Sequence, residues 1–491
     1  MMMTKTILSF ITVLGSCIAL SACKHELPKI DDTPQKIAAS GYPEEIGKIM
    51  ITRCATAGCH NKTSYKAAGG LRLDEWQHLF DGGTNGAVVV PYNTGNSSLL
   101  FFINPHDSLG LKVAPPMPYN GELLTRDEYY TFKNWIAKGA PNKDNIVAFS
   151  SNPNQRQKLY LTQQGCDLIA VIDAEKSVVM RYINIGRSPN PENPHYVKFD
   201  SDGIYAYVCY TSGEYIQKID TRIDTVVAEA YVGPGSWNVL YLSPDNKTLV
   251  VSDLTGGNVV FVDADAMTKG ITIPGFKQPH GITANKTADT FIVTGQQGNF
   301  VYKFNKSGVK QQISIDENVP SDQFRKDPHE IMMSPDFSKY FLTCERSNEV
   351  RIMDAYADTL IKIIPVGAVP KEMAISKNKP YLFVTCMEDV SQTSALFKGS
   401  VYVLNYNTLE VVQRIDGPFF QPHGIAVNDQ DGTFYIANTN TNPNGPAPHH
   451  PSDCGSRNGY YQVYDINTLA PKINYRFEVA PDPYSMDVRF K

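Results

Sequence analysis

PHEIMMSPDFSKYFLTCERSNEVRIMDAYADTLIKIIPVG, residues 328–367, is one complete copy of a unit that recurs along the chain. The unit begins with a Pro-His motif at 328–329 and has a turn signal, Ser-Pro-Asp, at 334–336. Apolar runs follow at 340–343 and 350–354, and another run closes the unit. Short apolar runs between turn residues predict β-strands, so each unit predicts four strands.

The motif that opens this unit returns at the intervals that mark propellers and solenoids. The last copy is followed by a single strand-like run, 485–490, whereas the first unit, 158–185, lacks its innermost strand. We therefore expect the C-terminal strand to complete the first blade and close a ring of seven four-stranded blades. The copies begin at Pro194, Trp237, Pro279, Pro328, Pro370, Pro422 and Pro483.

Two runs within these units carry a family resemblance. Tyr160-Leu161-Thr162-Gln163 and Tyr435-Ile436-Ala437-Asn438 resemble the Tyr-Val-Thr-Asn repeat of a family of seven-bladed β-propellers. The resemblance implies that residues 155–491 form an all-β propeller of this type.

A different motif, Cys-Ala-Thr-Ala-Gly-Cys-His, occupies residues 54–60. A covalent haem site needs two thiols that reach the porphyrin vinyl groups and an adjacent imidazole that binds the iron. Cys54, Cys59 and His60 supply these groups, although four residues separate the cysteines where the usual signature has two. The alternative is a local disulfide beside a chance histidine.

The surrounding sequence predicts helices and a second iron ligand. Ile46, Ile49 and Met50 precede the motif with helical spacing, and Thr125 with Glu128 forms a capping box at the start of a closing helix. Between them, prolines hold Met117 in a rigid loop, where its thioether could reach iron. The alternatives are that Met117 only covers a core, or that His78 or His106 is the distal ligand.

The order of segments 54–60, 69–74, 115–118 and 135–141 resembles a family of bacterial cytochrome c domains. The resemblance implies a small all-α domain at 43–145 with one covalent haem c. It also implies Cys54 and Cys59 as the thioether links, His60 as proximal ligand and Met117 as distal ligand.

The start of the chain predicts export. Lys5 precedes an apolar run from 7 to 20, which indicates a secretory signal at 1–22. Leu20-Ser21-Ala22-Cys23 resembles a bacterial lipobox, which implies a lipidated Cys23, a tether at 23–42 and a membrane anchor in the bacterial cell envelope, on the periplasmic or outer-membrane side. The alternative is an ordinary secretory signal with an incidental Cys23.

Charge and cysteine content exclude some functions. The net charge is −5 and no basic stretch occurs, so nucleic acid is not expected as a partner. An odd number of cysteines lies outside the signal, the lipobox and the haem motif, which argues against a full disulfide framework. Cys209, Cys344 and Cys386 hold equivalent repeat positions and are expected to be buried thiols; Cys166 and Cys454 complete the set.

Histidines of the repeat motif suggest a second site. His195, His280, His329 and His423 are expected at the mouth of the central channel, and an insertion, 439–458, adds His449, His450 and Cys454 on that side. Such a set could bind copper, zinc or a second haem. The alternative is that each imidazole only hydrogen-bonds to neighbouring backbone.

Two functions follow from this organisation. The first is a membrane-anchored c-type cytochrome that transfers single electrons, with the propeller docking an as yet unidentified redox partner protein. The second is a periplasmic oxidoreductase with a metal or second haem at the channel histidines, as in nitrite and nitrous oxide reductases, which this chain resembles in its domain pairing. The blade number and the channel residues depart from those enzymes, which favours the carrier. A calcium propeller would have only Glu330 and Glu372 as acidic ligands at the channel mouth.

Overall fold

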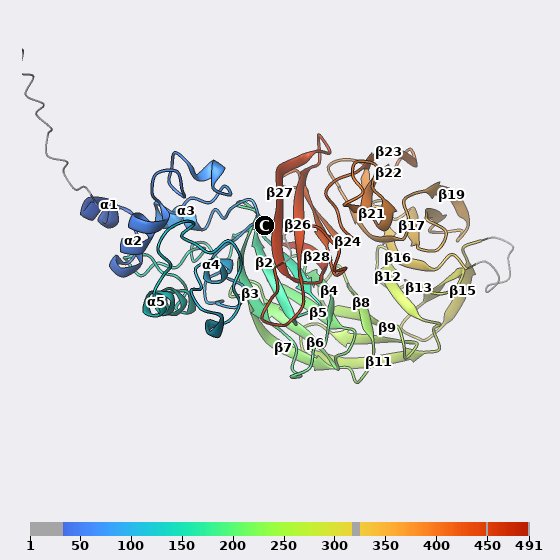
Figure 1. The fold of residues 1–491 in the computed structure, drawn as a ribbon. Helices are drawn as coiled ribbons and strands as arrows, with labels where there is room; N and C mark the ends of the chain where they lie inside the picture. The colour runs from blue at the N-terminus through green and yellow to red at the C-terminus, as the bar shows by residue number, and fades with distance from the viewer. Residues whose placement is uncertain (1–32, 317–324, 448–449, 490–491) are drawn as a thin grey trace, which may run out of the picture.

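The computed structural model describes residues 33–316, 325–447 and 450–489, in which a helical region lies beside a β-propeller (Figure 1). The predicted signal, the lipobox with Cys23, and His449 lie outside the described residues. Within the described ranges, no helix has both the length and the apolar character needed to span a membrane.

The strands form seven antiparallel sheets of four strands each, which confirms the predicted seven-bladed propeller. The blades comprise, in chain order, β1 Lys158–Gln163, β2 Leu168–Asp173, β3 Val178–Asn184; β4 Pro194–Phe199, β5 Tyr205–Tyr210, β6 Tyr215–Asp220, β7 Thr225–Tyr231; β8 Trp237–Leu242, β9 Thr248–Asp253, β10 Asn258–Asp263, β11 Thr268–Pro274; β12 Pro279–Ala284, β13 Phe291–Gly295, β14 Phe300–Phe304, β15 Lys310–Ser314; β16 Pro328–Met333, β17 Lys339–Cys344, β18 Glu349–Asp354, β19 Leu360–Pro365; β20 Pro370–Ile375, β21 Tyr381–Val390, β22 Lys398–Asn405, β23 Glu410–Ile415; β24 Pro422–Asn428, β25 Thr433–Asn438, β26 Asn458–Asp465, β27 Pro471–Pro481; and β28 Pro483–Arg489.

The C-terminal strand closes the ring. The first sheet has the order β28-β1-β2-β3, so β28 supplies the innermost strand that the first unit lacks. It pairs antiparallel with β1, with Leu161 opposite Met486 and Lys158 opposite Arg489. The prediction of closure by the C-terminal strand is therefore confirmed.

Every copy of the repeat motif begins an innermost strand. The strands β4, β8, β12, β16, β20, β24 and β28 contact one another in cyclic order around the axis. Inner strands such as β12 and β24 are buried along their whole length, whereas outer strands such as β15 are mostly exposed. The motif side chains are thus held on the most constrained part of each blade.

Buried thiols fill equivalent places between blades. Cys209, Cys344 and Cys386 are free and fully buried in the apolar clusters of the propeller. Burial raises the pKa of each thiol, that of Cys386 to about 12. These residues therefore behave as small apolar side chains.

The helical region has short helices joined by loops. Its closing helix starts at the predicted capping box, since Thr125 accepts from the Glu128 backbone and Glu128 accepts from the Thr125 backbone. Arg53 pairs with Glu128 at 2.8 Å and so ties the cysteine motif to this helix. The elements are α1 Thr33–Ala39, α2 Glu44–Ile49, the π-helix η1 Met50–Cys54, the 3-10 turns η2 Tyr65–Ala67 and η3 Asp107–Leu109, α3 Trp76–Leu79, α4 Ser98–Phe102 and α5 Arg126–Ala137.

The helical region packs against the first and last blades. Val90 belongs to the same apolar cluster as Phe477 and Val479 of β27. The backbone N–H of Glu478 donates to the carbonyl of Asn85 at 2.9 Å. Gly86 follows with φ +98°, and a Cβ there would lie 3.4 Å from the Glu478 nitrogen, so the two backbones approach closely.

A buried ion pair joins the first two blades. Lys158 of β1 donates to both carboxylate oxygens of Asp224, each at 2.9 Å, and Asp224 also accepts from the Tyr160 hydroxyl at 2.6 Å. Both charged side chains are almost fully buried. Removing the anion would leave a buried ammonium without its counter-charge.

We expect Asp224→Ala to lower the free energy of unfolding by about 3–5 kcal/mol. The control is Asp107→Ala, which removes an exposed carboxylate paired with Lys112 and should cost less than about 1 kcal/mol. Urea denaturation followed by circular dichroism measures both. Equal effects of the two substitutions would show that the buried pair does not hold the blades together.

Candidate functional site

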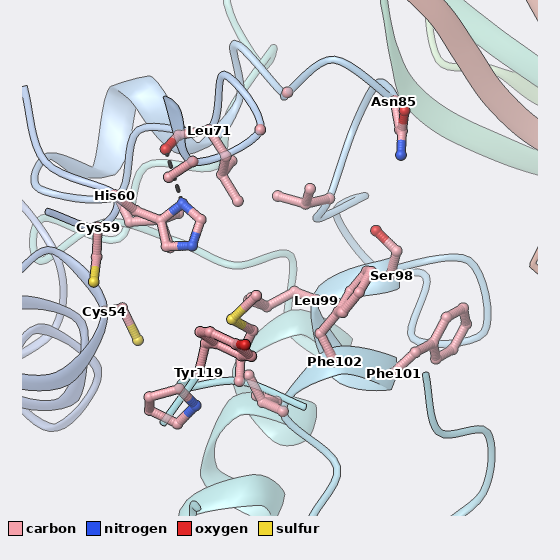
Figure 2. A pocket seen from close by; sticks show the side chains of 18 of the residues that line it. Cys54, Cys59, His60, Leu71, Asn85, Ser98, Leu99, Phe101, Phe102 and Tyr119 are labelled. Atoms are coloured by element: carbon pink, nitrogen blue, oxygen red, sulfur yellow. Dashed lines mark hydrogen bonds between the residues drawn. The ribbon is translucent and has the colours of Figure 1, made fainter. Parts of the chain in front are cut away.

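A cavity of about 870 Å³ lies where the helical region meets the propeller. This volume is within the range of about 300–1,000 Å³ that is typical of ligand and cofactor sites. Figure 2 shows Cys54, Cys59 and His60 together at one end of the cavity, with Phe101 and Phe102 on the other side. The lining includes Cys54, Cys59, His60, Leu71 and Met117 from the helical region, and Tyr182, His450, Asn458 and Glu478 from the propeller.

The cysteine motif is a compact loop at the end of a helix. Cys54 is the last residue of η1, and the backbone N–H of His60 returns to donate to its carbonyl at 3.2 Å. Gly58 has φ +83°, a left-handed conformation that glycine adopts without strain. The four-residue spacer therefore folds back and brings both thiols and the imidazole to the same cavity wall.

His60 presents one free nitrogen to the cavity. Its Nδ1 lies 3.1 Å from the Leu71 carbonyl oxygen, which can only accept, so Nδ1 carries the proton and Nε2 keeps its lone pair. Figure 2 shows this hydrogen bond, with the opposite edge of the ring turned toward the cavity. Burial lowers the pKa of His60, which favours the neutral ring. A ring oriented in this way is prepared to ligate a metal.

The two motif thiols are unlinked. Cys54 and Cys59 are both free and half-buried. Burial raises the pKa of Cys54 to about 12, although the charge of the neighbouring Arg53 acts in the opposite direction. The local disulfide that was the alternative at this motif does not form in the structure.

Met117 lines the same cavity. Its backbone N–H donates to the Phe102 carbonyl at 2.8 Å, which fastens the proline loop to α4. The competing residues do not belong to the lining: His78 bonds to Asp81 at 2.7 Å, and His106 precedes η3 on the surface. Among the three candidates for a distal ligand, Met117 is the one that lines the same cavity as His60.

The propeller wall of the cavity is polar. His450 Nδ1 lies 2.7 Å from a carboxylate oxygen of Glu478, and the Asn458 amide donates to Glu478 at 2.9 Å. The hydrogen bond to Glu478 raises the pKa of His450. The His450 ring packs edge-on to Phe102, with centroids 5.6 Å apart. The structure therefore places His450 at the cavity and not with the channel histidines.

The other four histidines of the predicted second site do come together. Their rings and that of Tyr484 form a closed circle, and each histidine is at most 6% exposed. The centroid separations are 5.8 Å for His195–His280, 4.0 Å for His280–His329, 6.1 Å for His329–His423, 3.6 Å for His423–Tyr484 and 4.4 Å for Tyr484–His195.

Cys454 is not available as a ligand thiol, because it forms a disulfide with Cys166. This bond joins the β1–β2 turn to the insertion between β25 and β26, across 288 residues of sequence. Ser452 of the same insertion donates to Asn96 of the helical region at 3.3 Å. The disulfide therefore fastens the segment that carries His450 next to the cavity.

Several residues of the cavity could not be found from sequence. The Leu71 carbonyl acts through backbone, which no side-chain pattern reveals. Glu478 and Tyr182 lie on ordinary strands and reach the cavity only because the helical region docks there. The length of the 439–458 insertion was the one available signal for His450.

Comparisons with known proteins give distant similarities. A scan against models of known protein families finds no match. The chain is 24% identical over 290 residues to the eukaryotic translation initiation factor 3 subunit I of Candida glabrata, covering 55% of this chain and 83% of that protein.

Among solved structures, Kuenenia stuttgartiensis hydrazine synthase aligns with a TM-score of 0.47 and 16% identity, covering 61% of this chain and 88% of that one. A functionally unknown protein from Desulfotomaculum acetoxidans aligns with a TM-score of 0.49 and 15% identity, covering 66% and 99%.

We expect alkylation of the unfolded, unreduced protein to leave Cys166 and Cys454 unlabelled and to label Cys209, Cys344 and Cys386. Peptide mass spectrometry should recover the first two as one cross-linked pair. Cys166→Ser should lower stability by about 2–4 kcal/mol, since the bond closes a long loop. Labelling of both Cys166 and Cys454 in the wild type would contradict the assigned disulfide.

Proposed function

We propose that this chain is a c-type cytochrome that transfers single electrons, with the propeller acting as a docking module for a redox partner. The observation that carries the proposal is that Cys54, Cys59, His60 and Met117 line one cavity. Met117 lies 63 residues after Cys54 in the sequence. A covalently bound haem with His and Met ligands uses two thiols as links to the porphyrin and an imidazole and a thioether as iron ligands.

The residues fit such a group. Cys54 and Cys59 are free to form thioether bonds, and His60 is held in the tautomer that leaves Nε2 available. Met117 is fixed by its backbone bond to Phe102. Haem bound by these residues would supply an iron centre that gains and loses one electron.

The rest of the cavity governs the environment of the cofactor. Leu71, Leu99 and Phe101 provide apolar surface in the lining. Glu478 and His450 place an ionisable pair on the propeller side. Because charge near an iron centre shifts its potential, these two residues would tune the electron transfer that the other residues make possible.

The proposal includes attachment to the bacterial cell envelope through a lipidated Cys23, which is supported by the sequence of residues 1–23. The partner is proposed to be a protein, because the chain has a net charge of −5 without a basic stretch for nucleic acid. The rigid ring of blades offers a large surface on which such a protein could dock.

Replacing the motif cysteines tests haem attachment. In protein made with cytochrome c maturation factors, Cys54→Ser/Cys59→Ser should carry no covalent haem, because both thioether links are removed. Intact mass spectrometry and the absorption spectrum measure this. Cys386→Ser, which removes a thiol buried in the propeller, is the control and should keep its haem. Covalent haem in the double variant would show that residues 54–60 are not the attachment site.

Replacing Met117 tests the distal ligand. Met117→His should keep covalent haem but lower the reduction potential, because Met ligation raises the potential relative to a second imidazole. Spectroelectrochemical titration measures the change. His78→Gln and His106→Gln should leave the potential as in the wild type. A potential that responds to either control and not to Met117 would assign the distal ligand elsewhere.

A further inference from the structure

The ring of imidazoles in the propeller channel has unused ligand atoms. His280 Nδ1 faces the His329 carbonyl at 3.2 Å, and His423 Nδ1 faces the Tyr484 carbonyl at the same distance. A carbonyl can only accept, so each Nδ1 carries the proton and each Nε2 keeps its lone pair. The hydrogen bonds to the backbone therefore engage Nδ1 of His280 and His423 and leave the Nε2 lone pairs unused.

Three atoms of this cluster are buried without a hydrogen-bond partner among the described residues. They are His329 Nδ1, His423 Nε2 and Glu330 Oε2. Buried polar atoms are rarely left unpaired, and an unfilled ion site is one of the recognised reasons. His280, His329 and Glu330 each offer a ligand atom, and these three atoms lie within 4.8 Å of one another.

We propose that His280, His329 and Glu330 bind a divalent first-row transition metal ion in the propeller channel, where the rings of His195 and His423 adjoin those of His280 and His329. Two imidazoles and one carboxylate are the ligand set of catalytic zinc sites and of non-haem iron(II) sites, which keep positions open for substrate. The site shares no residue with the haem cavity, and the inference does not depend on haem.

The ionisable side chains of the cluster are buried. Burial lowers the pKa of His195, His280, His329 and His423, so all four are neutral imidazoles, the form that ligates metals. Burial and the nearby Glu372 raise the pKa of Glu330 well above its usual range. A divalent ion bound to Glu330 would favour the ionised form of its carboxyl group.

The ammonium group of Lys371 near the ring is paired with a carboxylate. Lys371 occupies a motif position, and its Nζ lies 2.6 Å from Glu345, whose carboxylate is also 3.3 Å from His329 Nε2. Glu345 therefore pairs with Lys371 and also orients His329. With Nε2 directed to Glu345, His329 offers Nδ1, its unpartnered nitrogen, to the ion.

The kinds of ligand atom in this site indicate which class of metal ion it would bind. Calcium and magnesium require mainly oxygen ligands, whereas the three atoms within 4.8 Å of one another come from two imidazoles and one carboxylate. Imidazole suits zinc, copper, iron and nickel. A transition metal is therefore the expected occupant.

Metal analysis of the full chain tests the proposal. Cells are grown with added ZnCl₂, and the thiols of Cys54 and Cys59 are either haem-linked or alkylated so that they bind no metal. The wild type should contain one non-haem transition metal ion per chain. Glu330→Gln should weaken Zn²⁺ binding by more than about 100-fold. This loss exceeds the one expected when a residue that only hydrogen-bonds to a metal ligand is replaced.

Two controls separate ligation from folding. Glu372→Gln alters the equivalent buried carboxylate of the next blade and should weaken binding by about tenfold or less, since Glu372 lies outside the ligand set. X-ray absorption of zinc in the wild type should show imidazole ligands at about 2.0–2.1 Å, a result that requires no variant to fold. Wild-type protein without a non-haem metal, zinc without imidazole ligands, or equal loss in the two Glu variants would overturn the proposal.

Discussion

The pairing of β28 with β1 is the constraint on which both sites depend. It brings Tyr484 between His195 and His423 and so completes the ring of imidazoles in the channel. It also sets the last blade against the first, where the Ala480 backbone N–H donates to the Tyr182 hydroxyl at 3.2 Å. Tyr182 and Glu478 then form one wall of the cavity. Without the pairing of β28 with β1, neither the propeller wall of the cavity nor the ring of imidazoles would form.

The helical region and the propeller both line the cavity, and they supply different chemical groups. The helical region supplies two thiols, an oriented imidazole and a thioether, all held by backbone bonds within short loops. The propeller supplies a rigid polar wall through Glu478, and the Cys166–Cys454 disulfide fastens the neighbouring insertion. The short loops of the helical region thus gain a fixed partner surface, as the positioning of a binding site requires.

The repeat motif predicted the propeller, its seven blades and its closure. Packing against the neighbouring blades restricts the residues of each innermost strand, and the same motif therefore recurs in the sequence. The capping box at Thr125 and Glu128 likewise predicted the start of α5, since a cap is a local interaction. The Cys166–Cys454 disulfide and the position of His450 were not predicted. Both depend on how segments distant in sequence meet. The insertion 439–458 alone predicts His450 at the channel mouth, whereas the structure has it at the cavity.

The most direct test of the proposed function is mass spectrometry of the tryptic peptide from Cys54 to Lys62 of the wild-type protein, made with cytochrome c maturation factors. Trypsin cleaves after Arg53 and after Lys62, so this peptide contains both thiols and His60. We expect a peptide that carries one haem, with neither cysteine available to an alkylating reagent. A haem-free peptide with two alkylated cysteines, or with a disulfide between them, would contradict it.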